Sequence, residues 1–243
     1  MKFIILLSIL FSSCSIAVKT PSSRFISPEA KGEFLHTDLG MSYGGYSKGE
    51  LEPTGAGPVT DPLVMKHSQG VMANGTLGFT EQVDIYVVLP ERTTPQVGFK
   101  FQLLGKSEKE ATKKNHSLAT TIAYGRAKTT DADFLTSSND KADITNRVLD
   151  FSVIYGYRAE ENLLLYTGVS YSDYDFDGKF TSGANSGRIF QYDSKTLGCH
   201  AGLMTSNKKW FTKLEASLQQ TDWTHTGKQA YGFGAIQVGY NWN

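Results

Sequence analysis

The sequence has little cysteine, no excess of either charge and no long apolar stretch. Its 243 residues include only 2 cysteines, Cys14 and Cys199, so no disulfide framework stabilises the fold. The 24 basic and 24 acidic residues cancel, and no Lys/Arg cluster is interleaved with aromatic residues, which argues against a nucleic-acid partner. Beyond the N-terminus, no apolar run approaches the roughly 20 residues that a membrane-spanning helix needs.

The N-terminus has the layout of a secretory signal peptide, with one Lys followed by an apolar run that is too short to span a membrane. Two cleavage sites compete. Ser15 and Ala17 place small residues where signal peptidase I reads them, which gives a signal peptide of residues 1–17. Residues 11–14 instead resemble a loose lipobox, which gives a signal peptide of residues 1–13 and a lipid-modified Cys14. Both alternatives predict an exported protein.

Apolar and polar residues alternate through most of the remaining chain. From Leu35 to Tyr43 the odd positions are mostly apolar and the even positions are polar or small. The same period of two recurs in blocks of about ten residues, which is typical of β-strands with two different surroundings. We therefore expect an all-β protein of ten strands, with eight as the alternative count. The expected strands are residues 35–43, 70–79, 83–89, 97–103, 117–125, 149–158, 165–172, 196–203, 210–223 and 230–243.

The polar face of these strands favours a barrel over a soluble β-sandwich. A sandwich would expose that face to water and enrich it in Lys, Glu and Thr, whereas here it carries Gly, Ala and Ser beside isolated charges of both signs. Small residues suit a narrow lumen, and an apolar outer face suits lipid. Aromatic residues end the apolar face, as girdles do at the two membrane interfaces: Tyr43, Tyr124, Tyr157, Tyr171, Trp210, Tyr240 and Trp242. The prediction is a closed antiparallel up-and-down transmembrane β-barrel.

The lengths of the connections support the same fold. Most of the connections after odd-numbered strands are long and polar, at residues 46–68, 90–95, 130–143, 178–188 and 224–229. Three of the four connections after even-numbered strands are short, and the charged turn at residues 106–115 is the exception. Long loops outside, short turns inside and an even strand count are typical of bacterial outer-membrane barrels.

With these features, residues 33–243 resemble the bacterial outer-membrane β-barrel superfamily, specifically the small OmpA- and OmpW-like, porin-type barrels. The last strand, with Ile236, Val238, Tyr240 and Trp242 on alternate positions, looks like the signal read by the barrel-assembly machinery, although the chain ends in Asn243. The resemblance implies the outer membrane of a Gram-negative-type bacterium, with lipid, lipopolysaccharide and the assembly machinery as partners. It also implies a structural or narrow porin-like role with surface-exposed loops. Residues 18–32 are expected to form a periplasmic N-terminal segment.

Titratable residues fall on the predicted inner face at nine positions: His36, Asp38, Asp84, Lys100, Asp150, Arg158, His200, Lys213 and Glu215. Interior salt bridges explain them, because unpaired buried charge is costly, and a narrow pore or ligand pocket is the alternative. His36, Asp38 and His200 are residue types that bind zinc. No hydrolase, P-loop or metalloprotease motif accompanies them, so we expect no enzyme, metal or cofactor. The rival functions are a secreted or lipid-anchored β-sandwich binding protein and, less favoured, a barrel enzyme.

The segment Asp173 to Gly178 carries the D-x-D-x-D-G start of a calcium-binding loop. An EF-hand needs a Glu at the twelfth position, where this chain has Ala184. The alternation instead places Asp173, Asp175 and Asp177 on the lipid-facing side of their strand, so the strand should leave the bilayer just after Tyr171. We expect the three carboxylates to lie at the extracellular rim as a possible cation site. Cys199 falls on the outward face as an inert apolar residue.

Overall fold

The computed structural model describes residues 18–51, 57–91, 93–133, 140–207 and 209–242. The predicted signal peptide, the two alternative cleavage sites and Cys14 lie outside these residues. No helix in the described part of the chain is long and apolar enough to cross a membrane.

The regular elements of the described chain are strands, which confirms the all-β prediction. They are β1 (Val18–Pro21), β2 (Thr37–Glu50), β3 (Val64–Gly78), β4 (Val83–Pro90), β5 (Gln96–Leu104), β6 (His116–Asp133), β7 (Lys141–Glu160), β8 (Leu163–Ser182), β9 (Ile189–Ser206), β10 (Trp210–Trp223) and β11 (Gly227–Trp242). Residues 70–79, the weakest of the sequence predictions, belong to β3.

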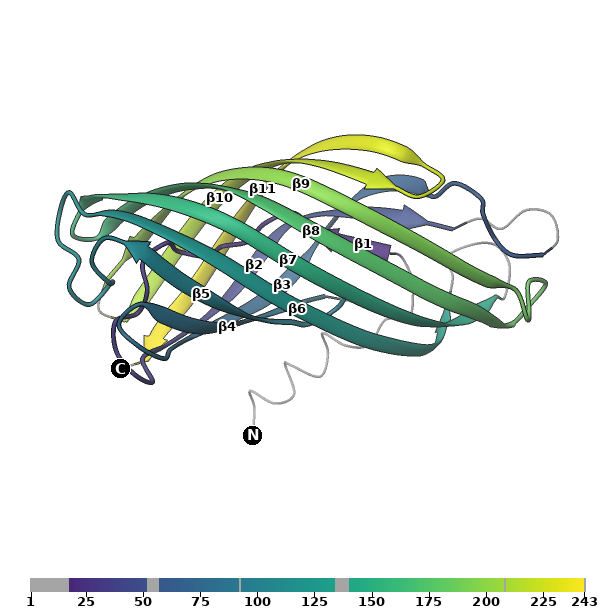
Figure 1. The fold of residues 1–243 in the computed structure, drawn as a ribbon, viewed down its shortest axis with the longest axis horizontal. Coiled ribbons are helices and arrows are strands. Elements are labelled where there is room, and N and C mark those ends of the chain that lie inside the picture. Colours follow the sequence, from purple (N-terminus) through teal and green to yellow (C-terminus); the bar gives the residue numbers. More distant parts are fainter. Residues whose placement is uncertain (1–17, 52–56, 92, 134–139, 208, 243) are drawn as a thin grey trace.

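Strands β2 to β11 form one closed antiparallel barrel (Figure 1). Each strand pairs with the next along the chain, and β2 also pairs with β11, which closes the sheet. The predicted up-and-down topology and the count of ten are therefore confirmed, and the alternative count of eight is wrong. A single sheet that closes on itself also excludes the two packed layers of a β-sandwich.

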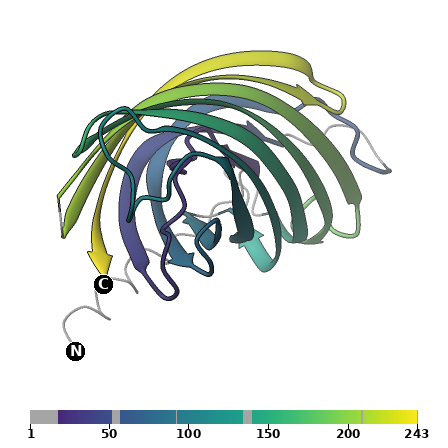
Figure 2. The ribbon, with the colours of Figure 1, turned by 60° about the vertical axis from the view of Figure 1, so that its left-hand side comes forward.

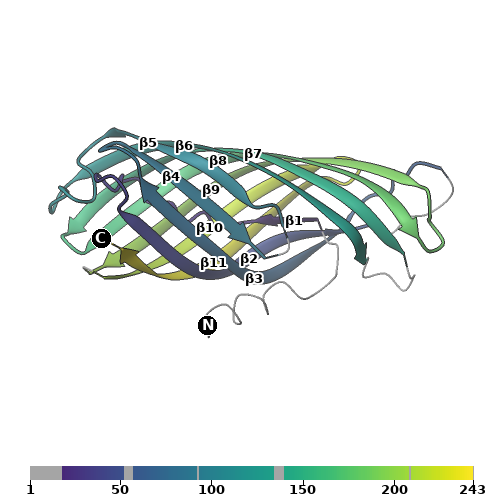
Figure 3. The ribbon, with the colours of Figure 1, turned by 90° about the horizontal axis from the view of Figure 1, so that it is seen from below.

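The two ends of the barrel differ. The end that carries the C-terminus, on the left in Figures 1 and 3, has the turns at residues 79–82, 105–115 and 161–162 and the connection between β9 and β10. We call it the turn end. At the opposite end, which we call the loop end, β7, β8 and β9 extend well beyond the rest of the wall. Strand residues therefore enter both predicted loops: β6 and β7 include residues 130–133 and 141–143, and β8 includes residues 178–182, where alternation continues with charged residues on the outer face.

The outer wall carries a broad apolar belt. Large side chains that face away from the lumen are exposed around the barrel: Leu39, Met41, Tyr43, Leu89, Val97, Phe99, Phe101, Leu103, Ile122, Tyr124, Leu149, Phe151, Tyr155, Leu165, Val169, Tyr171, Leu197, Trp210, Leu214, Leu218, Ile236, Val238 and Trp242. The residues between them point inward and are mostly buried, as the alternation in β9 and β10 shows. Such a belt would be unfavourable in water and favourable in lipid.

β2 meets two partners along its closing edge. From Thr37 to Tyr43 it pairs with β11, and from Tyr46 to Gly49 it pairs with the short strand β1. The loop-end half of β11, from Gly227 to Ala235, pairs with β10 and has no register with β2. The barrel is thus closed by β11 at the turn end and lined by β1 at the seam toward the loop end.

Candidate functional site

The N-terminal segment before β2 lies inside the barrel. Residues 18–32 were expected to form a periplasmic segment, whereas residues 20–31 are buried in the lumen (Figure 2). The segment enters beside the loop-end half of β2, descends through the lumen and reaches the turn end before Thr37. We call residues 20–31 the plug.

Its first part is held by neutral hydrogen bonds. The N–H of Ser22 donates to the carbonyl of Gly45 at 3.2 Å, and the Ser22 hydroxyl donates to the same oxygen. The side-chain amide of Gln219 donates to the carbonyl of Ser22 at 2.9 Å. These bonds join the plug to β2 and β10.

On the turn-end side of these bonds, the side chain of Arg24 brings a positive charge into the lumen. Its guanidinium forms an ion pair with Asp150 and donates to Ser172 Oγ at 2.6 Å. The carboxylate of Glu215 accepts the N–H groups of Arg24 and Phe25 at 2.7 and 3.0 Å. The plug's guanidinium and two of its backbone amides therefore satisfy lumen carboxylates that would otherwise be costly to bury.

An apolar layer surrounds the next two plug residues. Phe25 and Ile26 belong to a buried cluster contributed by seven strands: Met72, Tyr86, Val88, Ala123, Ile154, Leu164, Tyr166, Met204 and Phe211. Beside this layer, Lys213 Nζ donates to the backbone carbonyl of Phe25 at 2.7 Å. The lumen is thus filled by side chains at this level.

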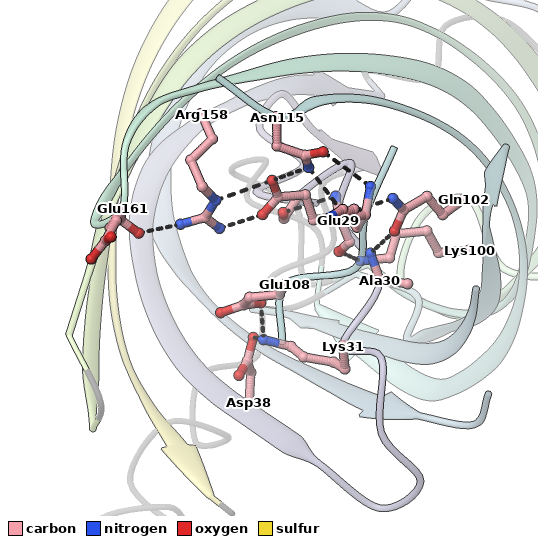
Figure 4. A network of polar contacts seen from close by, with 12 residues as sticks. Glu29, Ala30, Lys31, Asp38, Lys100, Gln102, Glu108, Asn115, Arg158 and Glu161 are labelled. Carbon is pink, nitrogen blue, oxygen red and sulfur yellow. Dashed lines mark hydrogen bonds and ion pairs between the residues drawn. The ribbon is translucent and has the colours of Figure 1, made fainter. Parts of the chain in front are cut away.

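Glu29 is the centre of the lower plug (Figure 4). Its carboxylate forms a two-pronged ion pair with Arg158, in which Nε donates at 3.1 Å, and it accepts the side-chain amide of Asn115 at 3.0 Å. Lys100 Nζ donates to the carbonyl of Glu29 at 2.5 Å and also pairs with Asp84 at 2.8 Å. Both Glu29 and Arg158 are buried, so each neutralises a charge that has little access to water.

Lys31 completes the plug at the turn end. Its Nζ pairs with Asp38 and with Glu108, the latter at 2.7 Å, and its N–H donates to Asp84 at 3.0 Å. Glu108 lies in the turn at residues 105–115, and its N–H also donates to the carbonyl of Ala30 at 2.7 Å. The charged turn predicted at residues 106–115, the exception in the pattern of connection lengths, therefore folds against the plug.

One glycine of the wall makes room for this segment. A Cβ added to Gly156 of β7 would lie 2.4 Å from Cγ of Pro28. Real Cβ atoms do not approach so closely, so the wall and the plug fit together only because position 156 has no side chain.

The structure places eight of the nine predicted lumen residues inside the barrel, buried: Asp38, Asp84, Lys100, Asp150, Arg158, His200, Lys213 and Glu215. Except for His200, each bonds directly to the plug. His36 is half-buried and precedes β2 at the turn end. Sequence reasoning had expected these charges to pair across the lumen, and the structure shows most of them paired with the plug.

The suggested zinc-type set is not brought together. Asp38 on β2 pairs with Lys31, and His200 on β9 lies edge-on to Tyr166 at 6.3 Å between ring centroids. Within the described ranges, no group of three or more His, Cys, Asp and Glu side chains could hold a metal ion. Cys199 lies exposed on the outer wall of β9.

The seven predicted girdle aromatics all lie on the outer face. Trp210, Tyr240 and Trp242 form a cluster at the turn end. The ring centroid of Tyr240 lies 5.1 Å from that of Trp210 and 5.2 Å from that of Trp242. Tyr157 lies near the same end of β7. Tyr43, Tyr124 and Tyr171 lie farther toward the loop end, where the apolar belt stops. The aromatic residues thus mark both edges of the belt.

The three aspartates of the predicted rim site lie on the outer face of β8, directly beyond Tyr171. The guanidinium of Arg147 pairs with Asp175 at 3.2 Å and with Asp177 at 3.1 Å, and Asp173 lies opposite Lys195. Burial and the carboxylate of Asp177 raise the pKa of Asp175 above its ordinary value, and Arg147 offsets part of that effect. Protein cations thus already face these carboxylates, and cation binding stays a prediction.

A second apolar cluster fills the mouth at the loop end. Leu51, Val59 and Leu63 of the β2–β3 connection join inward-facing residues of the extended strands, among them Tyr174, Phe176, Phe180, Phe190, Tyr192 and Trp223. The N–H of Val59 donates to the carbonyl of Ile189 at 2.9 Å. This connection folds into the mouth, so the lumen is filled at two levels.

Sequence reasoning missed the plug residues Arg24, Glu29 and Lys31 and their partners Gln102, Glu108 and Asn115. The available signal was a count of charges. The predicted lumen set holds four carboxylates and three cations, and three further charges lie within the eight residues from Arg24 to Lys31. Nothing in the sequence paired them, because the partners are separated by up to 191 residues.

A closed antiparallel barrel of even strand number, with an apolar outer belt edged by aromatic residues, is a transmembrane β-barrel of the bacterial outer-membrane type. No known family model and no curated protein sequence matches the chain.

Several solved structures are similar to it. Ail, the attachment invasion locus protein of Yersinia pestis, solved with the heparin analogue sucrose octasulfate, has 11% identity and a TM-score of 0.39, over 86% of this chain and 100% of that one. The copper transporter OprC has 11% identity and a TM-score of 0.34, over 86% of this chain and 43% of that one. The outer membrane channel DcaP of Acinetobacter baumannii has 8% identity and a TM-score of 0.24, over 85% and 96%. Such distant likenesses leave the role of this chain to be argued from its own residues.

Proposed function

We propose that this protein is an integral outer-membrane barrel whose resting role is structural, with a lumen closed by its own N-terminal segment and long strands displayed at the cell surface. The narrow porin-like role suggested by the sequence would require displacement of that segment. No catalytic role is part of the proposal.

The observation that carries the proposal is the burial and bonding of the plug. Residues 20–31 bond to strands β2, β4, β5, β7, β8 and β10 and to the 105–115 turn. Three of the plug's side chains are charged, and all three are paired with lumen or turn residues. Because removing one partner of a buried pair is strongly unfavourable, this arrangement favours a plug that stays in place.

Planar-bilayer conductance of refolded protein tests this role. We expect residues 18–243 to be electrically silent and residues 33–243, which lack the plug, to give discrete current steps or noisy opening. Steady conductance from residues 18–243 would overturn the closed resting state. Silence of both proteins would mean that the second apolar cluster, at the loop-end mouth, closes the lumen by itself. The protein would then have a purely structural role.

A charge exchange keeps the test valid if the truncated chain does not fold. Glu29→Arg places two cations against each other, and Glu29→Arg with Arg158→Glu restores an opposite pair in the same place. We expect current from the single variant and silence from the double variant. Glu33→Arg is the matched control, because Glu33 lies just beyond the plug in an exposed pair with Lys109.

The surroundings proposed for the barrel follow from its outer surface. The apolar belt would contact membrane lipid, and the charged outer face beyond Tyr171 would lie among lipopolysaccharide headgroups. Recognition of the last strand by the barrel-assembly machinery is part of the same proposal. It is supported by the outward-facing series Ile236, Val238, Tyr240 and Trp242 of β11.

A further inference from the structure

The seam between β2 and β11 is paired along only part of its length. The ladder between these strands ends at Tyr43 and Ile236, and β1 takes over the edge of β2 from Tyr46 to Gly49. The loop-end half of β11 pairs with β10 alone. Two strands of the same chain therefore have access to one stretch of backbone, and only one of them can occupy it.

The register of the existing ladder shows how β11 would continue along β2. Continuing the same antiparallel alignment would place Gly45 opposite Gly234, Ser47 opposite Gly232 and Gly49 opposite Ala230. These six residues lie on the outer face of their strands, and all are small. On the inner face, Tyr46 would come opposite Phe233. The two strands thus match in both size and direction over the unpaired stretch.

In the observed state β11 lies over the outer side of β2 at this point. A Cβ added to Gly45 would lie 2.0 Å from Cδ1 of Phe233, so the ring lies directly against that glycine. His67 of β3 contacts Tyr231 edge-on, with ring centroids 4.5 Å apart. A groove of about 520 Å³ runs along the seam between Gly45, His67 and Phe233. Aromatic contacts, in place of ladder hydrogen bonds, close the wall here.

β1 and the first plug residues are held less firmly than residues 24–31 of the plug. The described contacts of residues 20–23 are the β1 ladder, the bonds of Ser22 to Gly45 and the amide of Gln219. Ion pairs begin at Arg24 and continue to Lys31. Phe25 has a positive φ of 52°, so the chain bends between the two parts. β1 also ends at Pro21, which has no N–H to donate to a sheet.

From this arrangement we propose that β1 and the loop-end half of β11 exchange on the edge of β2. In one state β1 lines the seam and Phe233 covers Gly45. In the other, β1 leaves the edge, the β2–β11 ladder extends to Gly49 and Ala230, and Phe233 turns into the space that β1 vacated. Ladder bonds lost with β1 are replaced by those gained with β11, while residues 24–31 of the plug keep their ion pairs. The exchange goes beyond the proposed resting role and does not require that any solute pass.

Two cysteine pairs that share Ser47 distinguish the states. Thr20 and Ser47 are direct partners in the observed ladder, and Ser47 and Gly232 would be direct partners after exchange. Facing residues of a ladder are close enough for a disulfide, whereas Cα atoms more than about 7 Å apart are not. In refolded protein carrying Cys199→Ser, we expect both Thr20→Cys/Ser47→Cys and Ser47→Cys/Gly232→Cys to crosslink under mild oxidation in lipid vesicles. Failure of the second pair to crosslink would overturn the exchange.

A glycine substitution then tests whether the two states compete. In a chain carrying all three cysteines, Gly45→Val should shift the crosslinks several-fold from position 20 to position 232, because a side chain at 45 collides with Phe233 only in the observed state. Gly234→Val is the control, since a Cβ there has nothing within 4 Å and should leave the ratio unchanged. An unchanged ratio in Gly45→Val, in protein that still migrates as a folded barrel, would contradict the proposal. Because conductance is not the readout, failure here is separate from failure of the closed resting state.

Discussion

Glu29 shows how strongly one residue in this lumen depends on its partners. Its buried carboxylate accepts hydrogen bonds from Arg158 and Asn115, and its backbone carbonyl accepts one from Lys100, in a space with little water. In such surroundings an ion pair contributes little over an apolar pair of the same shape, but a broken pair leaves one charge without compensation. The plug and the wall therefore constrain each other through single residues.

We expect Glu29→Ala to lower the free energy of unfolding by about 3–5 kcal/mol, because it leaves Arg158 buried without its carboxylate. Urea or guanidinium unfolding of the refolded barrel in lipid vesicles measures the change. Glu33→Ala provides the comparison. Glu33 and Lys109 are 3.0 Å apart, but their side chains are 52% and 53% exposed, so its loss should cost less than about 1 kcal/mol. Equal effects of the two substitutions would contradict the pairing described for the plug.

Strand β8 shows how the surroundings change along one element. Up to Tyr171 its outer residues, Leu165, Val169 and Tyr171, are apolar, while its inner face passes from Leu164 and Tyr166 in the apolar layer to the polar residues Ser170 and Ser172. Beyond Tyr171 the two faces reverse, with aspartates outside and Tyr174 and Phe176 inside. The outer face of β8 therefore suits lipid up to Tyr171 and water beyond it. The change of polarity marks the bilayer surface on this strand.

The strands could be predicted because each carries its own signal. In β9 and β10, apolar residues alternate with polar or small ones from Thr196 to Leu203 and from Lys213 to Gln219, so the period of two appears without knowledge of any partner. The extension of β8 beyond Tyr171 was harder to see, because the acidic positions looked like a loop. The parity that put Asp173, Asp175 and Asp177 on the outer face was nonetheless correct.

The plug could not be predicted in the same way. Residues 18–32 have no period, and only Phe25 and Ile26 are large and apolar. Their position depends on contacts such as Arg24 with Asp150 and Glu29 with Arg158, which join distant parts of the chain. Long-range charge pairing has no spacing that a single sequence reveals. The charged lumen residues were therefore identified from the sequence, but they were expected to pair with one another, whereas most of them pair with the plug.

A substitution within β7 tests where the bilayer lies on that strand. Phe151 is 47% exposed on the apolar belt, and an arginine there should cost about 2–4 kcal/mol if it lies near the middle of the membrane. Thr145→Arg is the matched control on the same strand and face, beyond the belt and opposite Asp177, where the cost should fall to about 0–1 kcal/mol. Unfolding in vesicles measures both. A neutral Phe151→Arg would place β7 outside the hydrocarbon.

On the scale of the whole molecule, closure of the sheet decides how much unpaired backbone the barrel exposes to its surroundings. Strands β2 and β11 lie at opposite ends of the chain, and their pairing removes the exposed edges that an open sheet would present. Only the loop-end half of this seam lacks the ladder, and it begins directly beyond Tyr43, where the apolar belt on β2 ends. The unpaired backbone of β11 thus starts at the edge of the belt. Within the belt, the strands that would contact the hydrocarbon of the membrane are hydrogen-bonded on both edges.

This arrangement predicts how the intact protein behaves on fractionation. We expect it to remain in the outer-membrane pellet through salt and alkaline washes and to leave only with detergent, because the belt of exposed apolar side chains has no favourable contact with water. Unheated samples in SDS should migrate differently from heated ones, since a barrel whose sheet closes on itself resists unfolding until it is heated. A periplasmic protein of known solubility, fractionated in parallel, controls for trapping in vesicles. Release of this chain by a buffer wash, together with migration that heating does not change, would exclude the membrane-spanning barrel and with it the roles proposed for the belt and the rim.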